Sequence, residues 1–307
     1  MKREKILIVG TGAMASLFAA RLAGVAEVTL LGMWEEGLDA LETQGVRLVE
    51  TGETEESFAV RVARSPEACT GAKMAIVLVK AWQTRRAADQ LADCLHPRGI
   101  ALTLQNGLGN QEILEGALGV ERVGFGVTTT GATILDPGRV RSGGKGPIHF
   151  KPQPSMNPLV ELLTKAGFEM DPVEDVQGLL WGKLVINAGI NPLTALLEVP
   201  NGALLASSSI MEVMVSAAEE TASVAAALGV KLPFADPGAQ VMDVARSTGE
   251  NISSMLQDIH RGAPTEIDAI SGAIVREGER AGIATPINWT LWHLVQGKVM
   301  LKQGRDR

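Results

Sequence analysis

A short apolar run that leads into a glycine turn, close to the N-terminus, constrains the fold of this chain more than any other feature. Ile6-Leu7-Ile8-Val9 has the pattern of a β-strand, Gly10-Thr11-Gly12-Ala13-Met14-Ala15 follows it, and a helical pattern continues to Ala23. In a strand–turn–helix of this kind the first glycine permits the tight turn and the second lets backbone approach a pyrophosphate. The free N–H groups of the first helical turn also favour an anion.

An ordinary glycine turn would contain the same residue types, but the position inside a β-α-β pattern favours a dinucleotide site. We expect the cofactor to contact Gly10, Thr11, Gly12, Ala13 and Met14. The residue that recognises the ribose normally lies about 20 positions further on, where an acid favours NAD and a base favours NADP. This chain has Gly32 and Met33 there, and Glu35 and Glu36 are expected to begin a solvated helix.

The same N-terminal segment imitates a secretory signal peptide, because the basic Met1 to Lys5 precedes the uncharged Ile6 to Ala20. Two glycines in its middle argue against that interpretation, and the segment is too short to span a membrane. No other run reaches the roughly 18 apolar residues of a membrane helix. Two cysteines in 307 residues fit a reducing compartment, so we expect a cytoplasmic protein without membrane contact.

Short strand-like runs alternate with helical segments through the first half of the chain, which predicts a parallel α/β sheet. Helices are expected at 13–23 and 82–95, and residues 121–150 are expected to add antiparallel strands to the sheet. The clearest strand candidates are residues 5–10, 27–31, 74–79 and 100–104.

The second half has a helical character, rich in Ala, Glu and Met. The expected helices are Trp181 to Ile190, Ser208 to Leu228, Asp236 to Arg246, Ile267 to Ala281 and Pro286 to Leu301. We place the boundary near residues 172–177, where Asp171-Pro172 precedes a polar link. The chain is therefore expected to form an α/β domain over residues 1–174 and an all-α domain over residues 175–307.

Composition excludes several chemistries. The chain has no tyrosine, which excludes any mechanism that needs a tyrosine as proton donor. Its four histidines and two cysteines show no ligand spacing, so we expect no metal site. A proton donor must then be sought among Lys, Asp and Glu. The formal charge of −7 argues against a nucleic-acid partner.

One lysine has an unusual setting. In the segment 181–192 the strongly polar side chains are Lys183, Asn187 and Asn191, and their four-residue spacing puts all three on one stripe of an otherwise apolar helix. Pro192 is expected to end or kink that helix. Burial lowers the pKa of a lysine, so Lys183 is a candidate proton donor near neutral pH. A lysine that extends to solvent at a domain boundary is the structural alternative.

A second polar cluster covers residues 251–258 and 264–268. Thr265 and Asp268 resemble a capping box, which would place Glu266 in the first turn of a helix, where it would serve only the helix dipole. Ser253 and Ser254 could likewise do no more than begin a helix. A functional role for Glu266 and Ser254 is the competing interpretation.

Taken together, these segments resemble the ketopantoate reductase (2-dehydropantoate 2-reductase) family over nearly the whole chain. The resemblance rests on the turn at residues 10–15 and on Lys80-Ala81-Trp82-Gln83, Gln105-Asn106-Gly107, WGKLVINAGINPLTA, Pro200-Asn201-Gly202, ENISSMLQD and Thr265-Glu266-Ile267-Asp268. It implies a Rossmann-type domain followed by a helical domain like that of 6-phosphogluconate dehydrogenase. It also implies NADPH-dependent reduction of ketopantoate to pantoate, on the route to pantothenate and coenzyme A.

The resemblance assigns roles to individual residues. Lys183 matches the family's general acid, and Glu266 matches the acid that orients the lysine and the bound ligands, including the cofactor. Asn106 matches a residue near nicotinamide and substrate, and Lys80 matches a residue near the ribose phosphate of the adenosine. The groups that match substrate-binding residues for the hydroxyl and carboxylate are Asn187, Asn191 and Ser254.

Two questions stay open from the sequence. Some family members have an arginine that binds the 2′-phosphate of NADP where this chain has Met33, which leaves NAD as an alternative cofactor. NADP is the expected cofactor because Lys80 can still bind that phosphate. The substrate could be another 2-oxo acid, since pockets discriminate weakly between similar substrates. A non-catalytic dinucleotide sensor is a further alternative, and a homodimer is possible, with Ile210 to Leu228 as one candidate interface.

Overall fold

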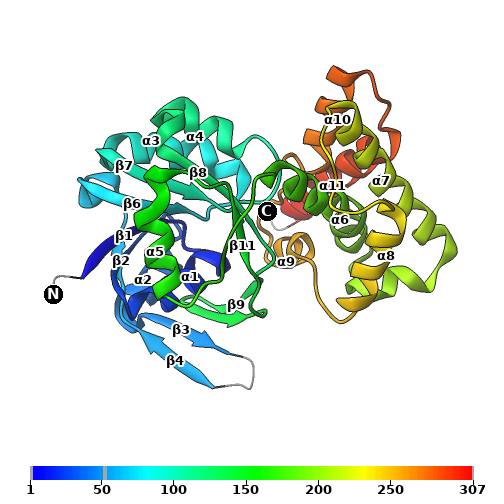
Figure 1. The fold of residues 1–307 in the computed structure, drawn as a ribbon. Helices are drawn as coiled ribbons and strands as arrows, with labels where there is room; N and C mark the ends of the chain where they lie inside the picture. Colours follow the sequence, from blue (N-terminus) through cyan, green and yellow to red (C-terminus); the bar gives the residue numbers. More distant parts are fainter. Residues whose placement is uncertain (1–2, 51–53, 306–307) are drawn as a thin grey trace. The chain divides into compact units, whose positions relative to one another are not determined.

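The chain folds into two compact units in this computed structural model, which describes residues 3–50 and 54–305 (Figure 1). The first unit comprises the chain as far as Gln105 together with Asn110–Val176. The second comprises Asn106–Gly109 and the chain from Gln177 onwards. A short segment from the first half of the sequence thus belongs to the helical unit. No helix among the described residues is long and apolar enough to span a membrane.

The first unit is the expected α/β unit. The four predicted strands and the helix at 13–23 are confirmed, while the helix expected from residue 82 begins at residue 84, after a short 3-10 turn. In chain order its elements are β1 (Glu4–Val9), α1 (Ala13–Ala23), β2 (Ala26–Leu31), α2 (Glu35–Gln44), β3 (Val46–Val49), β4 (Glu55–Phe58), β5 (Arg61–Ala63), η1 (Pro66–Cys69), β6 (Ala72–Val77), η2 (Ala81–Gln83), α3 (Thr84–Cys94), β7 (Leu95–Thr103), α4 (Asn110–Leu118), η3 (Val120–Arg122), β8 (Val123–Thr128), β9 (Ala132–Asp136), β10 (Arg139–Ser142), β11 (Ile148–Phe150), η4 (Pro154–Met156), α5 (Asn157–Lys165) and β12 (Met170–Pro172).

The main sheet has eight strands in the order β12-β11-β8-β7-β6-β1-β2-β5. The strands β5, β2, β1, β6, β7 and β8 are all parallel, and β1 lies between β2 and β6. Strand order reverses at β1 and β6, so their carboxyl ends form the switch point at which open α/β sheets bind ligands. The turn at Gly10 follows β1 directly and therefore lies at this point.

Alternate residues of β1 face two different cores. Ile6 and Ile8 pack with α1 and α5, whereas Leu7 and Val9 pack with α3 and α4. Figure 1 shows α3 and α4 together on one side of the sheet and α1 and α5 on the other. Burial on both faces explains why β1 is a continuous apolar run rather than an alternating one.

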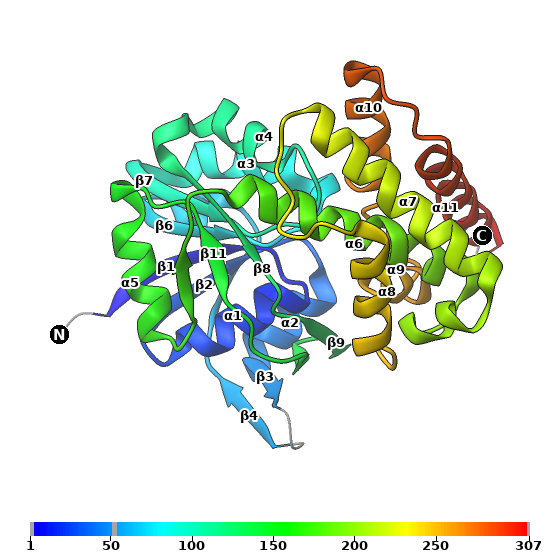
Figure 2. The same ribbon diagram turned by 45° about the vertical axis from the view of Figure 1, so that its right-hand side comes forward.

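The prediction for residues 121–150 was only partly right. β8 is parallel to β7, and β11 is the strand that pairs antiparallel with the main sheet, through β8. β9 and β10 leave that sheet and join β3 and β4 in a separate four-stranded sheet, in the order β4-β3-β10-β9 (Figure 2). β9 and β10 do pair antiparallel with each other, but the local sequence carries no information about their long-range partner β3.

The second unit is helical among its described residues. Its elements are α6 (Val176–Leu197), η5 (Asn201–Ala206), α7 (Ser208–Ala227), α8 (Pro237–Ser247), α9 (Ser254–His260), α10 (Ser271–Ala281) and α11 (Pro286–Arg305). α6 contributes to two cores: Trp181, Leu184 and Ala188 pack in one, and Val185 and Ile190 pack in the other with α7 and α8. Figure 2 shows α7 and α8 beside α6.

Pro192 does not end α6, which excludes the first of the two expected outcomes, an end or a kink. The helix runs on to Leu197 with the proline inside it. An internal proline removes one backbone hydrogen bond and costs about 3 kcal/mol. Burial of apolar residues on both sides of Pro192, including Ile190, Leu193 and Ala195, offsets that cost and keeps the residues after it helical.

The capping box expected at Thr265 is also wrong, because α10 begins at Ser271 rather than near residue 266. Glu266 lies in a turn in which its carbonyl accepts hydrogen bonds from the N–H groups of Ala269 and Ile270. The Ala269 carbonyl accepts from the N–H of Leu108 at 3.1 Å instead of from the next turn of a helix. A tertiary contact with the segment Asn106–Gly109 therefore replaces the local helix start.

Candidate functional site

The glycine turn after β1 has a backbone that other residues could not adopt easily. Gly10 has φ +129°, and a Cβ there would lie 2.9 Å from the carbonyl oxygen of Leu78. Its N–H donates to the carbonyl of Leu31 at 2.8 Å, which joins the turn to the end of β2. The turn is thus fixed by the ends of β2 and β6, the two neighbours of β1.

Gly12, the N-cap of α1, has a different property. Its φ of −82° suits any residue, and a Cβ there would meet no atom within 4 Å. No side chain caps this helix, and no acidic residue lies in its first turn. Open space beside uncapped helix N–H groups suits a pyrophosphate, which would accept their hydrogen bonds. The residues of this turn therefore fit a dinucleotide.

The positions around the expected ribose are placed as follows. Lys80 follows β6 and is half-buried, and its N–H donates to the Gln83 side chain at 3.3 Å. Met33 follows β2 and is 53% exposed. The expected start of a helix at Glu35 is confirmed, because α2 begins there. One residue missed from the sequence, Arg64, follows β5 beside the end of β2.

The three polar residues of α6 lie on one stripe, as their spacing predicted. Lys183 and Asn187 are half-buried and Asn191 is buried, with 7% of its surface exposed. The neighbours Leu184, Val185 and Ala188 are almost completely buried. The stripe is consequently a narrow polar strip on a helix whose other faces form core.

Burial sets the protonation behaviour of Lys183. It lowers the pKa of the lysine from 10.5 to about 8, and the negative charge of Glu266 partly offsets this effect. Glu266 is itself buried, with 6% exposed, and lies in the turn before α10, from where its charge acts on the lysine. The lysine of such a Lys–Glu pair is protonated at neutral pH, and its pKa lies close enough to the working pH for it to release the proton.

Asn187 is half-buried and Asn191 is buried, so both amide groups lie within the polar stripe of α6. Buried amides are usually paired, and the polar groups of a substrate are one kind of partner that such amides can bind. Three residues beyond Asn191, the Thr194 hydroxyl lies 2.7 Å from that of Ser253, the N-cap of α9. This contact, which the sequence did not suggest, brings the start of α9 to the same end of the stripe.

Ser253 and Ser254 have separate tasks in the structure. Ser253 is buried and caps α9 by accepting from the N–H of Leu256 at 3.1 Å, which confirms the helix-start interpretation for this residue. Ser254 is the first residue of α9 and is exposed. Of the two hydroxyls, that of Ser254 is therefore the one accessible to a ligand.

Asn106 is held near Glu266 by its neighbours. Gly107 has φ +80°, and a Cβ there would lie 2.5 Å from the carbonyl oxygen of Ala269, so this contact requires glycine. Together with the bond from Leu108 to Ala269, it docks the segment Asn106–Gly109 on the turn that contains Glu266. The second unit thus brings together Lys183, Glu266 and Asn106, and it also holds Asn187, Asn191 and Ser254. The glycine turn and Lys80 lie in the first unit.

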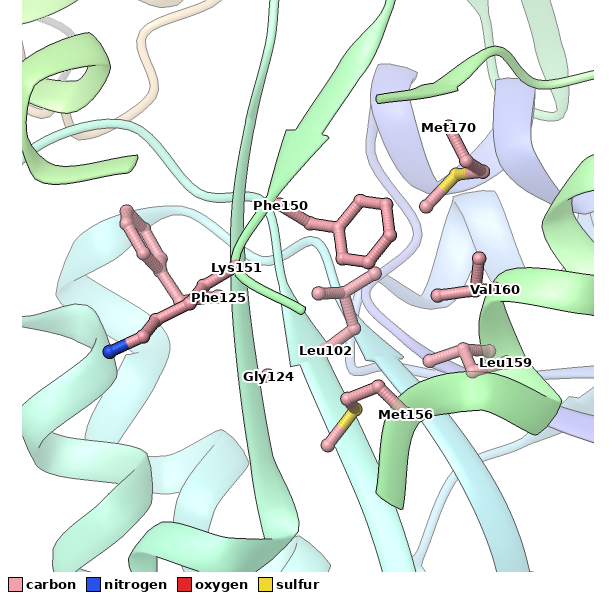
Figure 3. A pocket seen from close by; sticks show the side chains of 9 residues that line it. All are labelled: Leu102, Gly124, Phe125, Phe150, Lys151, Met156, Leu159, Val160 and Met170. Atoms are coloured by element: carbon pink, nitrogen blue, oxygen red, sulfur yellow. The ribbon is translucent and has the colours of Figure 1, made fainter. Parts of the chain in front are cut away.

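A small apolar void in the first unit is unrelated to these groups. It has a volume of about 10 Å³ and lies under β7, β8 and α5, where Leu102, Met156 and Leu159 line it (Figure 3). That volume is about the minimum for one water molecule, and the apolar lining offers such a molecule few partners. It is a packing defect rather than a ligand site.

Comparison with known proteins agrees with this architecture. The family model described as Ketopantoate reductase PanE/ApbA matches residues 6–155, and the model described as Ketopantoate reductase PanE/ApbA C terminal matches residues 175–299. The chain belongs to the ketopantoate reductase family. It is accordingly an oxidoreductase of a family that depends on a nicotinamide dinucleotide and acts on small 2-oxo acids.

Full-length relatives cover both units. A 2-dehydropantoate 2-reductase of Archaeoglobus fulgidus is 36% identical over 304 residues, which is 97% of this chain and 98% of the relative. The crystal structure of a PanE/ApbA family ketopantoate reductase from Ralstonia eutropha has a TM-score of 0.91 at 32% identity, over 97% of this chain and 99% of that one. D-mandelate dehydrogenase, solved with NADH and anilino(oxo)acetate, has a TM-score of 0.88 at 26% identity, over 96% and 98%.

The geometry of Gly12 gives a test of the dinucleotide turn. Gly12→Ala should leave the melting temperature within about 2 °C of wild type, because its φ and the open space accept a Cβ. It should weaken dinucleotide binding by at least about tenfold, because the methyl group occupies the approach of the pyrophosphate. Gly24→Ala, at the other end of α1 with φ −68° and open space, is the matched control. Equal affinities of both variants, measured by nucleotide fluorescence, would contradict the assignment.

Proposed function

We propose that this member of the ketopantoate reductase family reduces ketopantoate to pantoate with NADPH, and that Lys183 is the general acid. The observation that carries the proposal is the pKa of Lys183, which burial lowers to about 8, beside the buried carboxylate of Glu266. A proton donor is most effective when its pKa lies near the working pH. The chain has no tyrosine that could take this role.

The lysine and the glutamate divide the work of proton transfer. When bound, the nicotinamide supplies the hydride. The ammonium of Lys183 stabilises negative charge that develops on the ketone oxygen and then donates its proton to that oxygen. Glu266 raises the pKa of Lys183 and so keeps it protonated at neutral pH against the cost of burial. After the reaction the neutral amine of Lys183 takes up a proton from solvent.

The amides of the α6 stripe suit the substrate's polar groups. Ketopantoate carries a carboxylate, a ketone and a hydroxyl, and we assign Asn187, Asn191 and Ser254 to the carboxylate and hydroxyl. An asparagine amide has two N–H donors, so Asn187 and Asn191 can donate to both groups. We assign Asn106 to the neighbourhood of the substrate and nicotinamide, because its segment docks beside Glu266.

The choice of NADPH rests on Lys80. It follows β6, the strand next to β1, and its positive charge favours the 2′-phosphate of NADP over the bare hydroxyl of NAD. Met33 provides no charge at the end of β2. Lys80 therefore has to provide the preference without the arginine that some family members have.

A second candidate is the reduction of a different 2-oxo acid. D-mandelate dehydrogenase shares the fold over almost the whole chain, and it was solved with NADH and an aryl-substituted oxoacetate. Benzoylformate, an aromatic 2-oxo acid, has no hydroxyl that the amides of Asn187 and Asn191 could bind. Because sites built to bind a hydroxyl strongly reject analogues that lack it, these amides favour ketopantoate.

Absorbance at 340 nm distinguishes these functions. With the chain and NADPH, ketopantoate should be consumed with a kcat/KM at least about 10²-fold above that of 2-oxoisovalerate, which lacks the hydroxyl, and of benzoylformate, which is aromatic. Preference for benzoylformate would establish the second candidate. If no 2-oxo acid oxidised NADPH although the nucleotide binds, the chain would be a non-catalytic dinucleotide sensor.

Removal of the lysine should separate catalysis from cofactor binding. Lys183→Ala should lower turnover by about 10² to 10⁴, the usual contribution of a general acid, and leave the dissociation constant of NADPH within about twofold. Lys231→Ala, which removes an exposed lysine of the same unit, should retain wild-type turnover. Near-normal turnover of Lys183→Ala would eliminate the lysine as proton donor.

The pH profile should report the Lys183–Glu266 pair. Reduction requires the protonated lysine, so kcat/KM should fall as pH rises through about 8, whereas oxidation of pantoate requires the neutral amine and should rise there. Glu266→Gln removes the charge that raises the Lys183 pKa, so both midpoints should move below 8. Glu266→Asp retains the charge and should shift them less. Midpoints that stay in place in Glu266→Gln would refute the electrostatic role of Glu266.

A further inference from the structure

The residues that follow β2 contact the dinucleotide turn on one side and the end of β5 on the other. A Cβ on Gly32 would lie 2.5 Å from the Thr11 side chain, so Gly32 touches the turn directly. The N–H of Gly32 donates to the carbonyl of Ala63 at 3.2 Å, and Leu31 is in register with Ala63. Arg64, the next residue, therefore lies beside the position from which Rossmann folds recognise the adenosine ribose.

Arg64 is bound by three carboxylates. Its guanidinium contacts Asp39 at 2.5 Å, Glu42 at 3.0 Å and Glu35 at 3.3 Å, all on α2. The hydrogen bonds to Glu42 and Asp39 raise its pKa, so it carries its charge at every pH of interest. The carboxylates are each more than half exposed and Arg64 is 39% exposed. Three negative charges against one positive charge leave this cluster with a net charge of −2.

This arrangement affects the two cofactors differently. The 2′-phosphate of NADPH carries up to two negative charges that the hydroxyl of NADH lacks. An arginine beside the ribose would normally attract that phosphate, but here its donors are directed to α2. Met33, which follows β2, adds no charge to compensate.

We propose that the Arg64–Glu35–Asp39–Glu42 cluster is a specificity determinant for the cofactor, which opposes the 2′-phosphate and keeps the preference for NADPH over NADH small. The proposal rests on the dinucleotide site of the proposed function. It deepens that function, because Lys80 and the cluster act on the same phosphate with opposite sign. The wild-type ratio of the NADH and NADPH dissociation constants is then below about tenfold.

Direct binding tests this proposal without any substrate. Dissociation constants for NADPH and NADH are measured by nucleotide fluorescence at low and at physiological ionic strength, on wild type and on Asp39→Asn/Glu42→Gln. The double variant removes two negative charges and should raise the preference for NADPH about three- to tenfold at low ionic strength, with a smaller gain at higher salt. The matched control is Glu55→Gln/Asp136→Asn, which removes the two carboxylates that bind Arg139 on the separate four-stranded sheet.

The possible outcomes are distinct. A larger NADPH preference in the Asp39/Glu42 variant alone supports the proposal. An unchanged ratio, the same change in the control variant, or a wild type that prefers NADPH by far more than tenfold overturns it. If wild type bound neither nucleotide, the dinucleotide site itself would be wrong, and the proposed function would fail with it. If the ratio of the NADH and NADPH dissociation constants changed as expected in the Asp39/Glu42 variant, but the chain reduced no ketopantoate, only the substrate assignment would be refuted.

Discussion

The most consequential interaction in this chain is that between the half-buried Lys183, whose ammonium group is desolvated, and the buried Glu266. A cation taken from water into an apolar helix loses hydration free energy, and a nearby anion recovers part of it. Lys183 lies on α6, whose other faces form two cores, so packed side chains surround the helix that carries it. The same cores that stabilise the helical unit therefore set the proton affinity of the lysine.

The two halves of the chemistry depend on different parts of the chain. The dinucleotide turn offers backbone N–H groups and empty space, so what matters at Gly10 and Gly12 is the absence of side chains. The helical unit offers polar side chains, and several of them, such as Asn191 and Glu266, are buried. In the proposed function, the first unit binds the large common cofactor and the second binds the small substrate.

The sequence was most informative where a feature depends on neighbouring residues only. The strand and turn up to Ala15, and the stripe of Lys183, Asn187 and Asn191, follow from local spacing, and both are present in the structure. Glu266 was ambiguous because its apparent capping box is overridden by the contact of Leu108 with Ala269, between segments far apart in the sequence. Arg64 was missed because β5 has three residues, too few for a periodic signal, and its charge partners lie on another element.

The segment Asn106–Gly109 has a consequence for how the chain is made. Proteins emerge from the ribosome N-terminus first, and domains tend to fold as they appear. Here the first unit can be complete once Val176 has been synthesised, but Gly107 and Leu108 cannot reach their partner until Ala269 exists. The segment that contains Asn106 therefore cannot make this contact until most of the helical unit has been synthesised. A C-terminal fragment that begins near residue 175 would lack residues 106–109, and its Ala269 carbonyl would lose the N–H donor of Leu108.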